Sequence, residues 1–422
     1  MRVEGSLRVP GDKSISHRAL MLAALADGRS RITDILESAD VQSTAGALRA
    51  LGAAIPPLSP DITIDGVGLR GLRAAPGPLD CGNSGTTTRL MAGIAAAHPF
   101  SSCFAGDESL SRRPMRRVAR PLEAMGARVD LPSHGGLPMT VHGDALKDLD
   151  WTSDVASAQV KSAILLAGVV AGVRVSLDEP ARSRDHTERM LGARAVDVAV
   201  RGSRIELASG HRAIAPLDTA VPADPSSASF LAALAALADE GSLILEAVCV
   251  NETRCGFFET LRRMGAHVEF ARDTLTGGEW VSPVVVHPGA LRGVRVESEI
   301  VPSMIDELPL LACVAARAEG ETIISGASEL RLKESDRIAA VVANLRAIGV
   351  DAEERPDGMR VVGSRRPLRG AVRSFADHRL AMAFGVLGAL PGNDIRVDDR
   401  ACVAVSYPDF WRDLDRVRRP PP

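Results

Sequence analysis

Lysine is scarce in this chain of 422 residues. Of its 50 basic residues 46 are arginines, and the four lysines are Lys13, Lys147, Lys161 and Lys333. Arginine keeps its proton at any ordinary pH, whereas lysine can release its proton when its pKa is lowered. A lysine within a polar cluster is therefore a candidate for proton transfer, and Lys13 and Lys333 both lie in such clusters.

Paired cysteines, long apolar runs and an excess of charge are also missing. The six cysteines form no CxxC pair and have no metal-site spacing to histidine, so we expect free thiols and no metal centre. No apolar run reaches the roughly 18 residues of a membrane span, and the N-terminus lacks a signal-peptide pattern. A formal net charge of −3 argues against nucleic acid as a bulk partner. These absences predict a cytoplasmic protein that binds neither membranes nor nucleic acid.

The length predicts two domains, and one short phrase predicts how each is built. A helix end, a glycine and a short strand recur five times, with Gly52, Gly126, Gly192, Gly265 and Gly349. We expect each glycine to follow its helix in a left-handed conformation. The proline-rich stretch 215–227 would separate three α/β modules from three more. Chance recurrence of a common α/β phrase remains the alternative.

Six segments place polar residues directly before an apolar helical pattern. They are 9–28, 81–97, 157–168, 222–237, 329–345 and 375–388. Each one alone would be read as an ordinary capping segment. Helix N-termini carry unpaired N–H groups and positive partial charge. Six helix N-termini that converge on one place would therefore bind an anion strongly. The 81–97 segment is glycine-rich, but it is not a Walker A loop.

Two segments are rich in like charges. In 111–122, five arginines fall within nine positions, and most of them are interpreted as a solvated face. In 329–345, a helix beginning before Lys333 would place Lys333 and Arg337 on one face, where like charges are unfavourable. A pair between Glu334 and Arg337 is also possible. The hypothesis for this segment is a bound anion that relieves the repulsion.

Eight motifs, in order from about residue 5 to residue 415, resemble those of 5-enolpyruvylshikimate-3-phosphate synthases. They are PGDKSISHR, GNSGTTTR, SRRPM, SAQVKSA, SRDHTERML, DPSSASF, LRLKESDR and DHRLAM. SAQVKSA and ELRLKESDR are similar to the class II form. Three departures stand out: Arg116 replaces a common glycine, the segment before Gly192 is shortened, and Val405 stands where class I members have a lysine.

The resemblance implies an α/β fold of two similar domains. Each would be an inside-out α/β barrel of three βαβαββ units, with helix N-termini facing an active-site cleft between the domains. One domain would comprise residues 12–222. The other would comprise 1–11 and 223–422, so that the chain crosses between them twice, near Gly11 and near Ala223.

The resemblance also implies the reaction. The enolpyruvyl group of phosphoenolpyruvate would pass to the 5-hydroxyl of shikimate 3-phosphate with release of phosphate, by a monomer that needs no metal or organic cofactor. Residues implied for shikimate 3-phosphate are Lys13, Ser14, Arg18, Ser157, Ala158, Gln159, Arg184, Asp306 and Lys333. Those implied for phosphoenolpyruvate are Lys13, Gly85, Arg113, Gln159, Arg337 and Arg379. The enzyme would be a target of the inhibitor glyphosate.

Catalytic roles follow for three residues. Asp306 would remove the proton of the 5-hydroxyl, Glu334 would protonate carbon 3 of phosphoenolpyruvate, and Lys13 would shuttle protons and clamp phosphate. One rival is UDP-N-acetylglucosamine enolpyruvyl transferase, which has a reactive loop cysteine that the arginine-rich loop here lacks. The other is a non-catalytic anion-binding relative, against which the presence of Lys13, Asp306 and Glu334 together argues.

Overall fold

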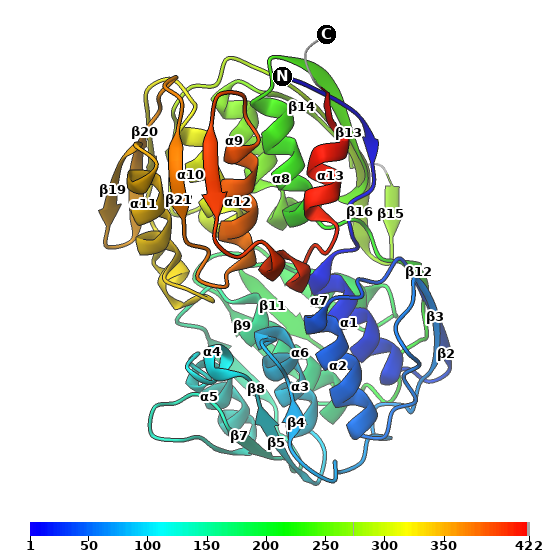
Figure 1. Cartoon of the computed structure of the whole chain (residues 1–422). Helices are drawn as coiled ribbons and strands as arrows, with labels where there is room; N and C mark the ends of the chain where they lie inside the picture. Colours follow the sequence, from blue (N-terminus) through cyan, green and yellow to red (C-terminus); the bar gives the residue numbers. More distant parts are fainter. Residues whose placement is uncertain (273, 420–422) are drawn as a thin grey trace. The chain divides into compact units, whose positions relative to one another are not determined.

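The computed structural model describes residues 1–272 and 274–419, and its contacts divide the chain into two compact units (Figure 1). The N-terminal unit comprises Gly11–Val221 and Leu275–Glu279. The C-terminal unit comprises Met1–Pro10, Pro222–Thr274 and Trp280–Pro422. The short segment Leu275–Glu279 adds two crossings to the two that the sequence suggested.

The N-terminal unit contains three small sheets, each with its own helices. The first sheet has β2 (Arg29–Thr33), β3 (Asp61–Asp65) and β12 (Asp218–Ala220), with α1 (Lys13–Ala24) and α2 (Ala39–Ala50). The second has β4 (Leu79–Asp80), β5 (Ser101–Ala105), β6 (Arg128–Asp130) and β7 (Met139–His142), with α3 (Gly85–Ala96), α4 (Glu108–Ser111) and α5 (Arg116–Met125). The third has β8 (Leu149–Thr152), β9 (Val175–Asp178), β10 (Val198–Arg201) and β11 (Arg204–Leu207), with α6 (Ala158–Ala171) and α7 (His186–Gly192).

The C-terminal unit repeats this plan. One sheet contains β1 (Arg2–Leu7), β13 (Glu240–Cys249), β14 (His267–Glu269), β16 (Glu279–His287) and β23 (Arg418–Arg419), with β15 (Thr274–Thr276) beside β16 and with α8 (Pro225–Ala236) and α9 (Gly256–Met264). A second contains β17 (Arg295–Val296), β18 (Glu321–Ile324), β19 (Asp351–Arg355) and β20 (Gly358–Val362), with α10 (Leu308–Ala315) and α11 (Arg337–Ala347). The third pairs β21 (Arg369–Val372) with β22 (Asp394–Val397), with α12 (His378–Gly388) and α13 (Phe410–Arg416).

The modules share one strand topology, which confirms that the repeated phrase is structural. In four sheets the first and second strands are parallel, and the fourth strand lies between the second and third: β4-β5-β7-β6, β8-β9-β11-β10, β1-β13-β16-β14 and β17-β18-β20-β19. In the first module the leading strand is β12, which follows the other two modules in the chain and pairs in parallel with β2. Among the described residues, the sixth module retains only its parallel pair.

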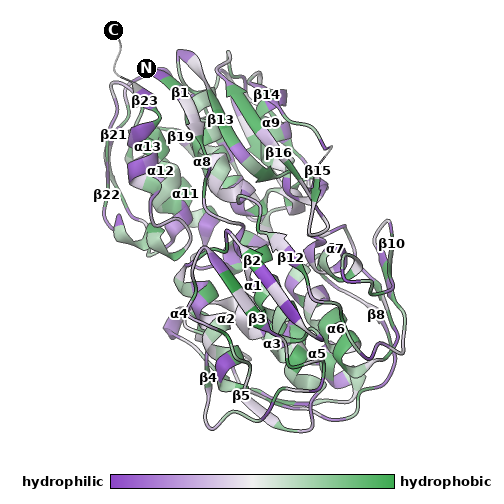
Figure 2. Ribbon diagram, turned by 90° about the vertical axis from the view of Figure 1, so that its right-hand side faces the viewer, coloured by the Kyte–Doolittle hydropathy of each residue, from purple (hydrophilic) through white to green (hydrophobic). Residues whose placement is uncertain are grey.

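Helices form the centre of each unit, and their sequences explain why. Every residue of α8 is buried, and α10 is buried along its whole length. Figure 2 shows α6 and α8 largely in the hydrophobic colour. A helix that is apolar all round must be covered on every side, as it is here by sheets and other helices. In the N-terminal unit, α3 and α6 approach closely at Gly93, where a Cβ would lie 2.1 Å from the carbonyl oxygen of Ala163.

Two local predictions were wrong. Gly192 is the last residue of α7 and not a left-handed residue after it; Ala195 takes that conformation instead, with φ of 60°. The other four glycines of the phrase do have positive φ. The second error concerns Lys333, which precedes α11 with extended backbone, so that Lys333 and Arg337 do not share a helix face. Within the described part of the chain, no helix is long and apolar enough to cross a membrane.

Candidate active site

All six helices predicted at the polar segments begin with a capping side chain. A Ser or Asp side chain accepts a hydrogen bond from a backbone N–H in the first turn of each helix. These residues are Asp12, Ser84, Ser157, Asp224, Asp336 and Asp377. Capping therefore accounts for one residue in each segment, and the remaining polar side chains need another explanation.

Lys13 is the first residue of α1, and its ammonium is held by a carboxylate of the next helix. Its Nζ lies 3.0 Å from Oδ2 of Asp40 in α2, and both side chains are mostly buried. The contact fixes the long lysine side chain at the start of α1. Sequence inspection missed Asp40, because nothing in the order of residues shows that α2 begins beside α1.

Arg18 lies one turn deeper in α1 and is anchored by neutral groups. Its guanidinium donates to the hydroxyls of Thr187 and Ser162, at 2.7 Å each, and to the carbonyl of Ser14 at 2.9 Å. Burial lowers the pKa of Arg18 to about 10; the Glu188 carboxylate opposes this shift, and the positive charge of Arg184 adds to it. Arg18 therefore stays protonated near pH 7, and it lies close enough to Arg184 for their charges to interact.

Gly85, Arg89, Arg113 and Gln159 form a second group in the same unit. Oε1 of Gln159 accepts from Arg89 at 2.7 Å, and its amide nitrogen donates to Thr86 at 3.1 Å. A Cβ at Gly85 would lie 2.6 Å from Nη1 of Arg89 and 3.6 Å from Nη1 of Arg113. Two guanidinium groups thus face the α-carbon of Gly85, and a side chain there would require the guanidinium of Arg89 to move.

Arg113 is nearly buried and is held by short polar side chains. It donates to the amide oxygen of Asn83 at 2.6 Å and to the hydroxyl of Ser109 at 3.3 Å. Of the arginines in 111–122, Arg112 and Arg120 form exposed ion pairs with Glu108 and Asp154. The solvated-face interpretation therefore applies to Arg112 and Arg120, and Arg113 is distinguished from them by its burial and by its contacts with Asn83 and Ser109.

The start of α6 carries the predicted residues Ser157, Ala158 and Gln159, all half-buried. One turn further, Lys161 is buried and forms ion pairs with Glu179 at 2.8 Å and Glu188 at 2.9 Å. Burial raises the pKa of Glu188, although Lys161 opposes that shift. Lys161 is thus a structural ion-pair partner, in contrast to Lys13 at the mouth of its helix.

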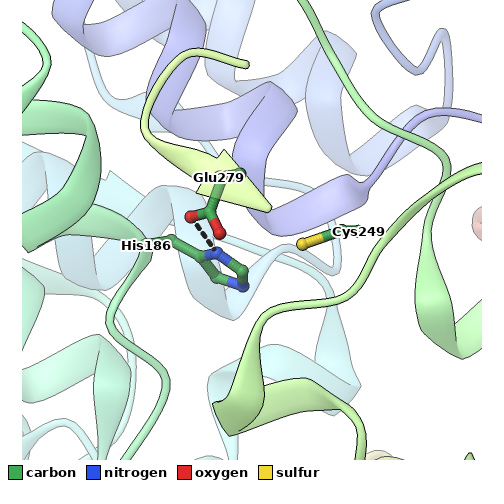
Figure 3. Close-up of side chains that lie close together, drawn as sticks. All are labelled: His186, Cys249 and Glu279. Carbon is green, nitrogen blue, oxygen red and sulfur yellow. Dashed lines mark hydrogen bonds and ion pairs between the residues drawn. The ribbon is translucent and has the colours of Figure 1, made fainter. Parts of the chain in front are cut away.

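The loop that carries Arg184 is fixed at the beginning of α7. His186, the first residue of α7, hydrogen-bonds through Nδ1 to Oε1 of Glu279 at 2.7 Å, and both are fully buried (Figure 3). Glu279 belongs to the short segment Leu275–Glu279 that the N-terminal unit includes. Arg189 and Arg182 pair with Asp185 on the same loop. These contacts hold the backbone on both sides of Arg184.

In the C-terminal unit, five predicted residues meet in one charged cluster. Oδ1 of Asp306 accepts from Lys333 at 3.3 Å and from Arg337 at 3.2 Å. Arg337 also pairs with Glu334 at 2.7 Å, as the sequence suggested. Arg379 lies 3.7 Å from Oδ2 of Asp306 and donates to the Asp306 carbonyl at 3.4 Å. The structure therefore relieves the repulsion between Lys333 and Arg337 with protein carboxylates.

Arg337 is the centre of this cluster. It is fully buried, and it donates through Nε to Asp377 at 2.8 Å. Burial works against its charge, but the carboxylates of Asp377, Glu334 and Asp306 outweigh burial and raise the pKa of Arg337. Asp377 in turn is fully buried, and Arg337 lowers its pKa despite the cost of burial. Both groups are therefore charged at neutral pH.

Asp377 was missed as a site residue, although it stands in the quoted motif DHRLAM. It caps α12 by accepting from the backbone N–H of Arg379 at 3.0 Å, and it also accepts from Ser335. The two residues before it, Phe375 and Ala376, both have φ of 56°, a left-handed conformation that costs energy for non-glycine residues. This turn links Arg337 and Arg379 through a single carboxylate.

The comparisons with known proteins cover almost the whole chain. The family model "EPSP synthase (3-phosphoshikimate 1-carboxyvinyltransferase)" matches residues 1–414. A 3-phosphoshikimate 1-carboxyvinyltransferase of Sulfurihydrogenibium sp. is 46% identical, covering 99% of this chain and 98% of the relative. The corresponding protein of Xanthomonas campestris pv. campestris is 47% identical, covering 97% and 93%.

Solved structures agree with this relationship. The EPSP synthase of Acinetobacter baumannii superimposes with a TM-score of 0.87 at 40% identity, covering 99% of this chain and 96% of that one. The enolpyruvyl transferase NikO of Streptomyces tendae shares the fold, with a TM-score of 0.75 at 21% identity, covering 99% and 95%. The predicted fold class, two similar inside-out α/β barrel domains, is confirmed. Given a family match over residues 1–414 and relatives nearly half identical along their whole length, the chain belongs to the EPSP synthase family.

Proposed function

We propose that this enzyme transfers the enolpyruvyl group of phosphoenolpyruvate to the 5-hydroxyl of shikimate 3-phosphate, as 3-phosphoshikimate 1-carboxyvinyltransferases do. The observation that carries the proposal is the family match over residues 1–414. The products are 5-enolpyruvylshikimate 3-phosphate and phosphate. A UDP-N-acetylglucosamine enolpyruvyl transferase is less well supported, because the relatives reported above carry the other name.

The N-terminal unit supplies cations suited to phosphate. Lys13, Ser14, Arg18, Ser157, Ala158, Gln159 and Arg184 would hold shikimate 3-phosphate, with Asp306 and Lys333 of the other unit. The neighbouring positive charges of Arg18 and Arg184 support this assignment, since a bound phosphate would relieve their repulsion. Phosphoenolpyruvate would be held by Lys13, Gly85, Arg113, Gln159, Arg337 and Arg379.

The C-terminal cluster supplies groups suited to proton transfer. Asp306 would accept the proton of the 5-hydroxyl as the oxygen bonds to carbon 2 of phosphoenolpyruvate, while Glu334 protonates carbon 3. The tetrahedral intermediate then loses phosphate and a carbon 3 proton, which restores the double bond. Lys333 and Arg337 support the role of Asp306, because they hold its carboxylate in one position. Arg113, Arg337 and Arg379 would balance charge on the intermediate.

We further propose that the enzyme works without a metal or organic cofactor, as a cytoplasmic monomer, with domain boundaries at 12–222 and at 1–11 with 223–422. The decisive experiment measures phosphate release with both substrates and with each one omitted in turn. Release that needs both substrates is expected. Binding of both ligands without release of phosphate would instead identify a non-catalytic anion-binding relative.

A further inference from the structure

Three helices at the predicted anion site are joined by a buried row of polar side chains that the proposed mechanism does not use. His17 of α1, Thr44 of α2, and Thr87 and Ser84 of α3 are connected by contacts of 2.6, 2.7 and 2.8 Å. Each of these residues is at most 1% exposed. The row lies one helical turn below Lys13 and Asp40, because His17 follows Lys13 by four positions and Thr44 follows Asp40 by four.

The hydrogen bonds in this row run in one direction. The hydroxyl of Thr87 donates to Oγ of Ser84 at 2.8 Å, and the carbonyl oxygen of Asp40 is a second, more distant acceptor at 3.4 Å, so its one proton is not available to Thr44. Thr87 must then accept from Thr44, and Thr44 must accept from Nδ1–H of His17. This direction places a proton on Nδ1 of His17. Its Nε2 is buried and has no hydrogen-bond partner among the described residues.

The electrostatic surroundings agree with a neutral imidazole. Burial lowers the pKa of His17 to about 3, and the positive charges of Lys13 and Arg18 add to this shift against the opposing charge of Asp40. A charged imidazole is thus disfavoured near pH 7. A proton on each nitrogen would also leave a second buried donor without an acceptor.

The row ends at the turn that carries Gly85. Ser84 caps α3, and its Oγ accepts from both the backbone N–H of Thr87 at 3.1 Å and the Thr87 hydroxyl. The position of Ser84 therefore depends on Thr87, and so does the position of Gly85, the next residue in the chain. Thr87 also contacts the carbonyl of Asp40, the residue that holds Lys13. The same side chains therefore support the ammonium of Lys13 and the backbone at Gly85.

We propose that His17 is a positioning residue. It acts through Thr44 and Thr87 to hold Lys13 and Gly85 at positions from which both can contact the same anion. This proposal rests on the proposed function, in which Lys13 and Gly85 both contact phosphoenolpyruvate. Gly85 is assigned to phosphoenolpyruvate alone, whereas Lys13 is assigned to both substrates. Loss of His17 should therefore weaken phosphoenolpyruvate binding more than shikimate 3-phosphate binding.

The kinetic test compares His17→Leu with His17→Asn in the full chain. His17→Leu leaves Thr44 without its donor and should raise KM for phosphoenolpyruvate about tenfold, as expected for an unsatisfied buried group, with less than about a twofold change for shikimate 3-phosphate. His17→Asn retains a donor near Nδ1 and should restore most of the affinity. His98→Leu is the matched control, because His98 is also buried in this unit and its imidazole contacts Ile94 and Phe100, which do not belong to the row. Equal changes in both KM values, no rescue by asparagine, or the same pattern in the control would overturn the proposal.

A second measurement separates this proposal from the proposed function. Nitrogen-15 NMR of the histidine rings in the wild-type chain should show His17 as the neutral Nδ1–H form at pH 7. The Nε2–H form would contradict the direction of the row whether or not the chain has activity.

If His17→Leu fails to fold, the same kinetic comparison can be made at Thr44, the next residue of the row. Thr44→Val removes the hydroxyl and should raise KM for phosphoenolpyruvate, whereas Thr44→Ser keeps the hydroxyl and should not.

A different region of the C-terminal unit carries an independent inference. On β14, His267 and Glu269 point to one face of the sheet, and His287 of β16 lies directly opposite His267. One ligand atom from each of the three lies within 4.8 Å of the others, and the two imidazole centroids are 5.4 Å apart. His267 and Glu269 are well exposed, which leaves room for water ligands.

We infer that these three side chains form a surface site for a divalent transition metal such as Zn²⁺. Two imidazoles and one carboxylate suit zinc, nickel or copper better than magnesium or calcium. Calorimetric titration of the metal-free chain with Zn²⁺ should show one site, weakened about tenfold or more by His287→Ala. His142→Ala is the control, since His142 pairs with Asp130 without a second histidine. No binding, or equal binding by the His287→Ala chain, would overturn the inference.

Discussion

The two units hold their functional cations in different ways. In the N-terminal unit, Arg18 is anchored by hydroxyls and a carbonyl, and Arg113 by an amide oxygen and a hydroxyl. In the C-terminal unit, Lys333, Arg337 and Arg379 all contact the carboxyl group of Asp306. A hydroxyl, amide or carbonyl oxygen positions a guanidinium without adding a negative charge, which suits these contacts of Arg18 and Arg113 to binding phosphate. Carboxylate anchors cancel the charge and supply proton acceptors, so the C-terminal unit is suited to acid–base chemistry.

Lys13 is the exception in the N-terminal unit, because it is paired with Asp40. Its expected roles are also mixed, since it would bind phosphate and move protons. Lys13→Ala should lower turnover by about a hundredfold to ten-thousandfold. The measurement is kcat for phosphate release, with the exposed Lys147→Ala as the control in the same unit. Retention of more than a tenth of the wild-type rate would contradict the assignment.

The C-terminal cluster should respond in kcat and not in binding. Asp306→Asn and Glu334→Gln keep the shape of each side chain but remove its basicity or acidity, so each should lower kcat by about a hundredfold or more. Binding of shikimate 3-phosphate, measured by titration, should change much less. Glu353→Gln, an exposed position on β19, serves as the control. Normal turnover at saturation combined with lost affinity would mean that these residues only bind substrate.

The difference between charged and neutral anchors can be tested on stability. Asp377→Asn removes a charge from the fully buried partner of Arg337 and should cost about 3 kcal/mol of unfolding free energy. Thr187→Val removes one neutral acceptor from Arg18 and should cost about 1 kcal/mol. Urea unfolding of the two variants gives both values. Equal losses would show that the two kinds of anchor do not differ energetically.

The sequence predicted the local features of these sites better than the distant ones. Each helix entrance was visible because a capping Ser or Asp immediately precedes its helix, as with Ser84 and Asp336. The anchors of the charged residues were not visible, because Asp40 and Asp377 reach their partners through helix packing. Lys333 was misplaced because a helical pattern extends back to it, whereas Asp336 caps α11 three residues later and the backbone at Lys333 is extended.

Gly85 tests the finest detail of the N-terminal unit. Gly85→Ala would place a methyl group 2.6 Å from Nη1 of Arg89, so this guanidinium must move and its hydrogen bond to Gln159 must adjust. The phosphonate inhibitor glyphosate is slightly longer than phosphoenolpyruvate, so the added methyl should exclude it more severely. We expect the inhibition constant to rise about tenfold more than KM for phosphoenolpyruvate, because one methyl in a close-fitting pocket is worth that much discrimination. The catalytic constant should change least, since Asp306 and Glu334 lie on other elements. Paired measurement of both constants in wild type and variant decides the matter: an equal rise would mean that displacement of Arg89 weakens both ligands alike, and that Gly85 does not discriminate between them.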